Sequence, residues 1–372
     1  MPVQKLLCVF GTRPDAIKMA PVVLELKKRP GQFDVKVAVT GQHREMLDQV
    51  LAVFGIVPDF DLNIMQHGAN LAQVTTRSLS GLDPILEAEK PDWVLAQGDT
   101  TTTFVASLVA FYHRAKFGHV EAGLRTGNKF DPFPEEMNRL LTGRLATMHF
   151  APTPDAVDNL LREGVDPSTV IMTGNTVIDA LLDVAGRDYA GDDPEIKSVL
   201  AETRRVILVT SHRRENWGEP MQRIATAVKT IVDRLPDTMA VVPMHRNPLV
   251  RDTLRPILGS HDRVRLIEPP DYAPFVKLEQ KATLILTDSG GVQEEAPSLG
   301  KPVLVLRETT ERPEGVAAGT AKLVGTDVDL IVGESIRLLT DSDAYAAMAR
   351  AVSPYGDGGA AARIADALNA AG

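Results

Sequence analysis

The sequence contains a single cysteine, Cys8, among its 372 residues. No disulfide can therefore form within the chain, and a reducing cytoplasm is the compartment we expect. Apolar runs are short, and none approaches the roughly 18 residues of a membrane-spanning helix. The stretch "LLCVF" near the amino terminus is also too short for a secretory signal. These absences exclude an intrachain disulfide framework and predict a protein without a membrane span.

The sequence also lacks an excess of basic residues. Lys and Arg number 40 against 49 Asp and Glu, which gives a formal net charge of -9. A chain without a basic excess cannot neutralise many phosphates, so we expect no general binding to nucleic acid or to a membrane surface. No G-x-G-x-x-G follows the first apolar run, and no G-x-x-x-x-G-K-[ST] occurs, which disfavours a dehydrogenase or a P-loop enzyme. No H-E-x-x-H motif or cysteine cluster indicates a metal.

What the sequence does contain is a series of short apolar, β-branched runs separated by helical patterns. Examples are "KLLCVF" and "DWVLAQ" in the first half and "RRVILVT" and "ATLILT" in the second. Near-continuous apolar strands that alternate with helices are typical of parallel sheets covered on both faces. The length fits two domains. The sequence therefore predicts an α/β fold of two Rossmann-like, doubly wound domains that face a central cleft.

The pattern also predicts where the domains and several helices lie. Helices are indicated by a leading proline or by apolar spacing near 3.6 at residues 21–29, 101–114 and 219–235. We predict an N-terminal domain of residues 1–170 plus 356–372 and a C-terminal domain of residues 171–355. The stretch 162–183 would hold the linker and the start of the second domain. The final helical pattern would pack back on the first domain.

Glycine and polar residues follow the apolar runs at their carboxyl ends. The stretches are "GTRPDAIKMAP" (11–21), "GDTTT" (98–102), "EAGLRTG" (121–127), "SHRREN" (211–216), "HRNP" (245–248) and "DSGGVQEEA" (288–296). Ligands of open α/β sheets bind outside the carboxyl ends of the strands. Two domains with this pattern predict a ligand in the cleft between them.

The stretch "TDSGGVQEEA" combines glycine, serine and acid. Gly290 and Gly291 allow the backbone to approach a ligand closely, and the helix that follows offers free N–H groups and a positive end to an anion. Glu295, about one turn later, is placed to accept hydrogen bonds from sugar hydroxyls. We interpret the motif as a nucleotide-diphosphate site. The alternative is an ordinary turn followed by acids at a helix start.

Six motifs occur in an order that is characteristic of one family. They are "FGTRPDAIKMAP", "QGDTTTT", "HVEAGLRTG", "PFPEEMNR", "TSHRREN" and "TDSGGVQEEAPSLGKP". Over nearly its whole length the sequence resembles the non-hydrolysing UDP-N-acetylglucosamine 2-epimerases of bacteria. The resemblance implies the glycosyltransferase-B type of two-domain fold, interconversion of UDP-GlcNAc and UDP-ManNAc without NAD or metal, and a homodimer. It also implies elimination of UDP to 2-acetamidoglucal, followed by re-addition of UDP.

By this resemblance the acid/base candidates are Asp99, Glu121 and Glu135. Inversion at C2 requires proton transfer on two faces of the sugar, which an acid/base pair supplies. Clustered carboxylates raise one another's pKa, so one of them would hold a proton near neutral pH. Structural alternatives stay open at each position. Asp99 would otherwise cap a helix, and Glu121 would pair with Arg125. Glu135 and Glu136 would otherwise be acids at a helix start.

The remaining active-site candidates follow from the same resemblance. Lys18 would orient the carboxylates, or else pair with Asp15. His212 would contact the diphosphate and help UDP leave, or else belong to a solvated basic loop. The expected substrate-binding residues are Arg13, Arg213, Phe275, Ser289, Gly290, Gly291 and Glu295. Phe275 would stack on the uracil unless it is a core residue, and Arg13 would be a surface residue if it binds no phosphate.

The resemblance further implies a regulatory UDP-GlcNAc site next to the active site. Its residues would include Gln42, His43, Glu135, Arg213 and His245. Two features depart from the pattern of the family: Glu45 stands where glutamine is common, and "MQHGAN" (65–70) lacks an arginine. The added negative charge and the missing donor predict weak or absent activation by UDP-GlcNAc.

Other functions fit parts of the same pattern. A glycosyltransferase of this fold would use a similar UDP-sugar site, but a retaining transferase does not need three carboxylates. A hydrolysing 2-epimerase would release free ManNAc and UDP from a similar active site. A nucleotide-sugar sensor would bind without turnover, which the acid/base set disfavours.

Overall fold

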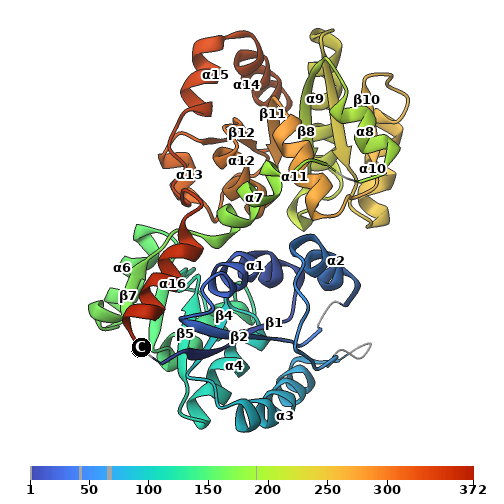
Figure 1. Ribbon diagram of the computed structural model, residues 1–372. Coiled ribbons are helices and arrows are strands. Elements are labelled where there is room, and N and C mark those ends of the chain that lie inside the picture. Colours follow the sequence, from blue (N-terminus) through green and yellow to red (C-terminus); the bar gives the residue numbers. More distant parts are fainter. Residues whose placement is uncertain (1, 42–43, 65–68, 190) are drawn as a thin grey trace. The chain divides into compact units, whose positions relative to one another are not determined.

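The computed structural model describes residues 2–41, 44–64, 69–189 and 191–372, with the backbone alone at 44 and 45. The chain forms two compact units. Unit 1 comprises Met1–Ala180 and Tyr355–Gly372, and unit 2 comprises Leu181–Pro354. Figure 1 labels the helices and strands of both units. None of the helices that these ranges contain has the length and apolar character needed to cross a bilayer.

Unit 1 is built on a parallel sheet of seven strands in the order β3-β2-β1-β4-β5-β6-β7. The strands are β1 (Gln4–Phe10), β2 (Phe33–Val39), β3 (Phe60–Asp61), β4 (Trp93–Gln97), β5 (Lys116–Val120), β6 (Met148–Ala151) and β7 (Val170–Met172). β1 pairs with β2 on one side and with β4 on the other. The order reverses between β1 and β4, and this switch point is where open sheets of this kind bind ligands.

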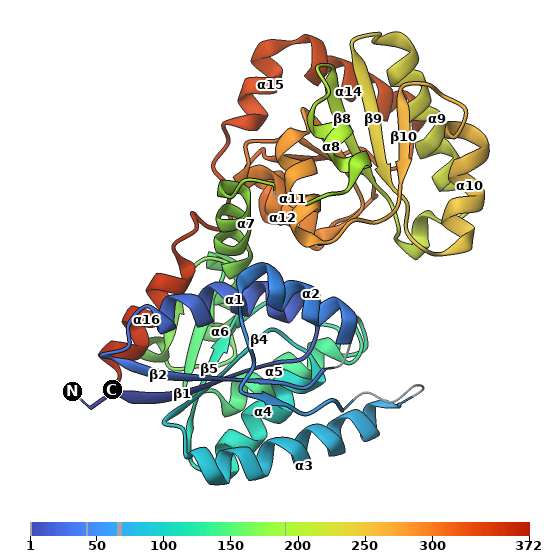
Figure 2. The ribbon, with the colours of Figure 1, turned by 45° about the vertical axis from the view of Figure 1, so that its right-hand side comes forward.

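Helices cover both faces of this sheet. They are α1 (Arg13–Lys27), α2 (Arg44–Phe54), α3 (Leu71–Glu89), α4 (Thr101–Tyr112), α5 (Glu135–Leu145), α6 (Pro154–Arg162), α7 (Thr176–Gly186), which runs into unit 2, and α16 (Ala360–Ala370). Figure 2 shows α1 and α2 on one face and α3 and α4 on the other. Alternate apolar residues of β1, such as Leu7 and Val9, join α3 and α4 in one core. α16 packs against α1, as the sequence predicts.

Unit 2 repeats this architecture with a six-stranded parallel sheet in the order β10-β9-β8-β11-β12-β13. The strands are β8 (Arg205–Thr210), β9 (Thr238–Pro243), β10 (Val264–Ile267), β11 (Leu284–Thr287), β12 (Val303–Val305) and β13 (Ala321–Leu323). The switch point lies between β8 and β11, which pair in register from Leu284↔Ile207 to Thr287↔Thr210. The residues that follow these two strands are therefore the candidates for ligand binding in this unit.

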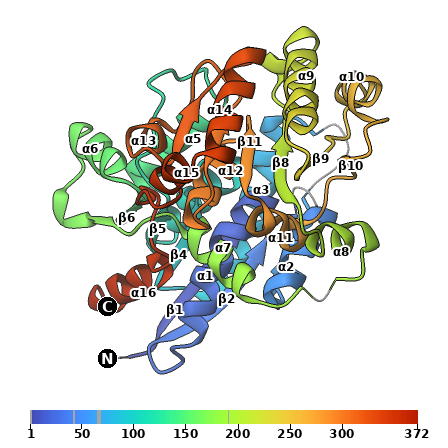
Figure 3. The same ribbon diagram turned by 90° about the horizontal axis from the view of Figure 1, so that it is seen from above.

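Two apolar cores hold the helices of unit 2 on its sheet. The helices are α8 (Pro194–Leu200), α9 (Glu219–Arg234), α10 (Pro248–Leu258), α11 (Tyr272–Lys281), α12 (Gly290–Ser298), α13 (Pro313–Ala317), α14 (Val328–Thr340) and α15 (Ser342–Ala349). α9, α10 and α14 form one core with the sheet, and α8, α11 and α12 form the other. Figure 3 shows α9 and α10 on one side of β8 and β9, with α8 and α11 on the other.

The two parallel sheets confirm the predicted α/β, Rossmann-like fold class, but three local features differ from expectation. β3 and β7 are too short to stand out as apolar runs, and β7 pairs with β6 inside the stretch assigned to the linker. The compact units change over at Ala180 rather than after residue 170. α1 begins at Arg13 and not at residue 21, because Thr12 and Asp15 form a capping box ahead of it. Pro21 lies inside this helix.

Candidate active site

Glu121 is the centre of a polar cluster at the carboxyl end of β5. Its carboxylate forms an ion pair with Lys18 of α1. Gln97 Nε2 donates to Glu121 Oε1 at 2.7 Å, and Asn175 Nδ2 donates to Oε2 at 3.1 Å. Arg139 of α5 donates to the Glu121 carbonyl. These donors match an ionised carboxylate. Glu121 also has a φ of 61°, which is uncommon outside glycine. Strained backbone of this kind occurs most often at functional sites.

Arg139 joins a second carboxylate, Asp99, to this cluster. The guanidinium forms an ion pair with Asp99 and lies 3.6 Å from Glu121 Oε1. Asn138 Nδ2 donates to the Asp99 carbonyl at 2.9 Å. The capping alternative for Asp99 is wrong, because Thr100 caps α4 by accepting a hydrogen bond from the Thr103 amide. The Asp99 side chain is thus placed beside Arg139, at the switch point of the sheet.

The pairings that the sequence offered as alternatives for Glu121 and Lys18 are also wrong. Arg125 binds Glu163 through two hydrogen bonds of 2.7 and 2.9 Å, and so it is not the partner of Glu121. Lys18 pairs with Glu121 and not with Asp15. α1 therefore directs its lysine across the sheet end toward β5. The structure brings three predicted residues, Lys18, Asp99 and Glu121, into one network through Arg139, which was not predicted as a site residue.

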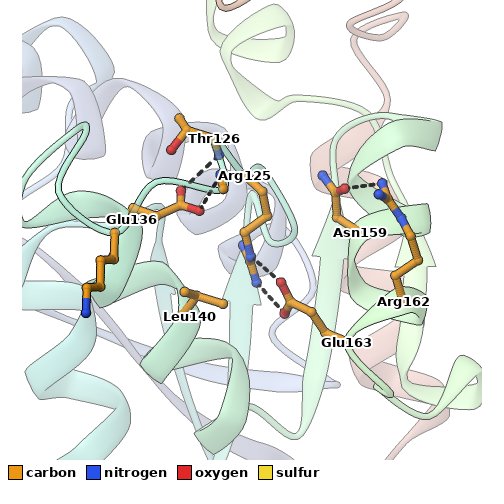
Figure 4. Close-up of a pocket in the computed structure, with 9 residues that line it drawn as sticks. Arg125, Thr126, Glu136, Leu140, Asn159, Arg162 and Glu163 are labelled. Atoms are coloured by element: carbon orange, nitrogen blue, oxygen red, sulfur yellow. Dashed lines mark hydrogen bonds and ion pairs between the residues drawn. The ribbon is translucent and has the colours of Figure 1, made fainter.

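Glu135 and Glu136 begin α5, and their environments differ. Glu136 is buried and accepts hydrogen bonds from the Thr126 and Gly127 amides at 3.1 and 3.0 Å (Figure 4). Glu135 is half-buried, and no hydrogen bond to its carboxylate is found among the described residues. Glu136 therefore anchors the loop after β5, while Glu135 is available to a ligand. It lies one helical turn before Arg139.

A pocket of about 440 Å³ borders this loop and is lined by Arg125, Thr126, Gly127, Lys129, Glu136, Leu140, Asn159, Arg162 and Glu163. Figure 4 shows that several of its charged side chains are satisfied within the wall, since Arg125 binds Glu163 and Arg162 contacts Asn159. None of the three candidate carboxylates lines this pocket. Its walls therefore support the loop, and the predicted acid/base residues lie outside this pocket.

A strongly raised pKa occurs at Asp15, a residue that was not predicted to belong to the site. Burial raises the pKa of this carboxyl to about 6, and the charge of Asp99 contributes in the same direction. Hydrogen bonds from Thr12 and from the Gly11 amide oppose the rise. Thr100 Oγ1 also donates to Asp15 Oδ2 at 3.4 Å. Asp15 thus links the starts of α1 and α4 directly behind Asp99. The capping pattern Thr12-x-x-Asp15 was the signal for it.

His119 holds the turn that carries Asp99. It is fully buried on β5, and its Nε2 lies 2.7 Å from the carbonyl oxygen of Gly98. Burial, followed by the charge of Arg139, lowers the pKa of His119 to about 3. The imidazole is therefore neutral at physiological pH, and its Nε2–H donates to Gly98. Gly98 itself has a φ of 77°, a conformation that glycine adopts at little cost.

Asp288 organises the switch point of unit 2. Its carboxylate is fully buried after β11 and accepts hydrogen bonds from Ser211 Oγ at 3.0 Å and from the amides of His212 and Arg213 at 2.9 and 3.0 Å. Asn216 Nδ2 adds another at 2.9 Å. Asp288 therefore fixes the loop that follows β8. Because Asp288 holds this loop in place, an acid precedes the glycines of "DSGG".

His212 and Arg213 project from that loop beside the start of α12. His212 Nδ1 lies 3.3 Å from Asp288 Oδ1, and its ring stacks on the exposed His245 with centroids 5.9 Å apart. Burial lowers the pKa of His212, and the charge of Asp288 offsets this only in part. The imidazole is therefore mainly neutral near pH 7. Arg213 Nε is buried and has no hydrogen-bond partner among the described residues.

The amino end of α12 lies between two guanidinium groups. A β-carbon at Gly290 would lie 3.7 Å from Arg213 Nη2 and 3.8 Å from Arg312 Cζ. Ser289 is the N-cap residue, yet its hydroxyl caps no amide among the described residues. Free helix amides, a serine hydroxyl and two arginines form a site that suits phosphate oxygens. The sequence indicated all of these residues except Arg312.

The two glutamates of "QEEA" have different partners. Glu294 forms an ion pair with Arg312, and it is therefore part of the wall behind the helix start. Glu295 is buried and accepts a hydrogen bond from the Tyr272 hydroxyl at 3.3 Å. Phe275, also on α11, is half-buried and packs against the core that α8, α11 and α12 share. A ribose contact for Glu295 and a uracil contact for Phe275 stay predictions.

Comparison with known proteins identifies the family. Residues 24–369 match the family model described as UDP-N-acetylglucosamine 2-epimerase. The chain belongs to the UDP-N-acetylglucosamine 2-epimerase family. It is 57% identical to the Escherichia coli (strain K12) enzyme of that name, covering 98% of each chain. It is 55% identical to the Bacillus subtilis (strain 168) enzyme, over 98% of this chain and 94% of the relative.

A solved structure agrees with this assignment. The UDP-GlcNAc 2-epimerase from Neisseria meningitidis, bound to UDP-GlcNAc, superimposes with a TM-score of 0.86 at 50% identity, covering 98% of this chain and 99% of that chain. The predicted family, the Rossmann-like fold and the enzyme class are confirmed, and the epimerase is an isomerase. The individual site residues stay predictions.

Several predicted residues of this epimerase lie neither in the network around Glu121 nor in the site at the start of α12. Gln42, His43 and residues 65–68 lie outside the described residues, and the side chain of Glu45 is not described either. Arg13 is half-buried at the first residue of α1, without an ion pair to any described residue. Gly291 is exposed at the start of α12. The structure therefore groups Lys18, Asp99 and Glu121 in unit 1 and His212, Arg213, Ser289 and Gly290 in unit 2. The regulatory set stays a prediction.

Proposed function

We propose that this epimerase interconverts UDP-GlcNAc and UDP-ManNAc by eliminating UDP and adding it back, without net hydrolysis. The observation that carries the proposal is the cluster in which Lys18 and Arg139 hold Glu121 and Asp99 at the switch point of unit 1. A solved relative supports it, since the Neisseria enzyme is bound to UDP-GlcNAc.

The chemistry assigns the carboxylates to proton transfer at C2. One carboxylate removes the C2 proton while the bond from C1 to the diphosphate oxygen breaks, and the electron pair forms the C1=C2 bond of 2-acetamidoglucal. In the return step UDP re-forms the C1–O bond, and a protonated carboxyl delivers a proton to the other face of C2. Asp99, Glu121 and Glu135 supply the groups for both steps. Lys18 and Arg139 fix the orientation of Glu121 and Asp99.

The residues around α12 are assigned to UDP. The helix amides, Ser289, Arg213 and Arg312 would bind the diphosphate, and Glu295 would accept hydrogen bonds from the ribose. An anionic diphosphate next to His212 raises the pKa of the imidazole, because a nearby negative charge favours the protonated form. His212 then donates a proton through Nε2 to the departing diphosphate. Binding of the diphosphate thus favours the protonated His212 that acts as the acid for its departure.

The test is an incubation with UDP-GlcNAc in heavy water, with the C2 proton followed by NMR. We expect UDP-ManNAc with deuterium at C2 and no dependence on an added acceptor. Free ManNAc would indicate the hydrolysing reaction instead. Substrate that stays unchanged although it binds, and that reacts only when an acceptor is added, would favour the glycosyltransferase. The homodimer and the regulatory site stay predictions that this experiment leaves unaffected.

A further inference from the structure

Glu279 is a fully buried acid in unit 2 that the proposed chemistry does not use. It lies on α11, in the same helix as Tyr272, and its side chain is 0% exposed. Neither of its carboxyl oxygens has a hydrogen-bond partner among the described residues. Leu278, the residue before it on α11, belongs to the apolar core that α8, α11 and α12 share. A buried carboxyl without hydrogen-bond partners is unusual, so the first question is whether Glu279 is protonated.

Ionisation of Glu279 would place a charge without a hydrogen-bond partner at a fully buried position, which is costly. Burial therefore raises the pKa of Glu279 well above its ordinary value, and the negative charge of Glu295 raises it further. Of the two acids, Glu295 has the better environment for a carboxylate, because the Tyr272 hydroxyl donates to it. No donor among the described residues reaches the Glu279 carboxyl, so when the two neighbouring acids hold one proton between them, it resides on Glu279.

The other charged groups near α11 have partners of their own. On α8, Lys197 pairs with Asp192, and Glu195 is exposed to solvent. On β8, Arg205 pairs with Asp237. Lys277 and Lys281 of α11 itself donate to backbone carbonyls. On α12, Glu294 pairs with Arg312. Glu295 is thus the charged group that acts on Glu279.

We propose that Glu279 is a positioning residue that stays protonated, keeps Glu295 the single carboxylate of the pair, and thereby makes nucleotide binding sensitive to alkaline pH. The inference rests on the proposed function, in which Glu295 binds the ribose. When Glu279 loses its proton, a second negative charge appears near Glu295 in the protein interior. The two acids then repel each other, and Glu295 no longer presents its oxygens to the ribose hydroxyls.

The experiment measures UDP binding by calorimetry between pH 7.5 and 9.5, where the phosphates are already fully ionised. The variant Glu279→Gln keeps the shape of the side chain but has no proton to lose. We expect equal affinity for the wild type and the variant at the lower pH. As the pH rises through the pKa of Glu279, the wild-type Kd should rise relative to that of the variant, by up to about tenfold for each pH unit beyond that pKa. Glu195→Gln, which removes an exposed acid of α8, is the matched control and should follow the wild type.

A melting experiment provides a second readout, because the folded protein retains a proton that the unfolded chain has lost. Stability then falls as pH rises from the ordinary pKa of a glutamate, and Glu279→Gln should melt progressively higher than the wild type from pH 5 upward. Glu279→Met serves the same purpose if the glutamine variant does not fold. UDP affinity with the same pH profile in wild type and variant would overturn the inference and leave the proposed function intact. Absence of UDP binding in both would overturn the two together.

Discussion

Glu135 and Glu136 are adjacent and chemically alike, and their contacts separate their roles. Glu136 holds the amides of Thr126 and Gly127, whereas no hydrogen bond among the described residues occupies Glu135. The sequence could not separate them, because both are acids in the first turn of α5. Only the path of the preceding loop, which brings two amides to Glu136, shows which of the two glutamates has a structural role.

This difference predicts opposite effects for two neighbouring substitutions. Glu135→Gln should lower kcat by roughly 10²–10⁴-fold, the range for loss of a general acid or base, without a change in melting temperature. Glu136→Gln should instead lower stability by about 1–3 kcal/mol, because it replaces a buried acceptor of two amides. Steady-state kinetics and thermal melting of both variants check this. Loss of activity with Glu136→Gln alone would reverse the assignment.

The lowered pKa of His119 predicts that the protein becomes less stable in acid. Its pKa is about 3 in the folded protein against an ordinary value of 6.5. Below pH 6.5 the unfolded chain binds a proton that the folded protein does not, so stability is lost as pH falls from 6.5 toward 3. Within this window the loss is up to about 1.4 kcal/mol per pH unit. Urea unfolding at pH 7 and pH 5 should show a smaller acid loss in His119→Gln, whose amide can still donate to Gly98. Parallel losses would contradict this role.

At the scale of elements, the loop after β8 depends on one buried side chain. Asp288→Asn should destabilise the protein by about 2–4 kcal/mol, because the amide nitrogen would face backbone N–H groups that now donate to a carboxylate. UDP binding should weaken as well, since His212 and Arg213 project from this loop. The control is Asp271→Asn, an exposed N-cap of α11 without a cap hydrogen bond from its side chain. Equal behaviour of the two variants in urea unfolding and calorimetry would count against the role of Asp288.

How well an element could be predicted depended on its length and on its partners. β1, β4, β8 and β11 are buried on both faces and stand out as continuous apolar runs. β3 has two residues, and the sheet around it decides its conformation. The burial that shifts the pKa of Asp15 and His119 arises from segments far apart in the chain, which no local pattern contains.

At the scale of the whole molecule, unit 2 is continuous in sequence and has two apolar cores of its own. We therefore predict that a fragment of residues 181–354 folds cooperatively and binds UDP, with a higher Kd than the full chain. Circular dichroism with urea and calorimetry with UDP test this. A fragment that shows no cooperative transition would mean that unit 2 requires the rest of the chain.

Unit 1, in contrast, is complete only with residues that follow unit 2 in the chain. The Asn175 amide donates to the Tyr355 carbonyl at 2.7 Å, and the Asn175 side chain donates to Glu121. During translation Tyr355 emerges after the whole of Leu181–Pro354, about 10–35 s later at 5–20 residues per second. The proposed catalytic carboxylate therefore lacks its finished surroundings on the ribosome until unit 2 has been made. A nascent chain would hold a nucleotide-binding unit before it holds a working epimerase.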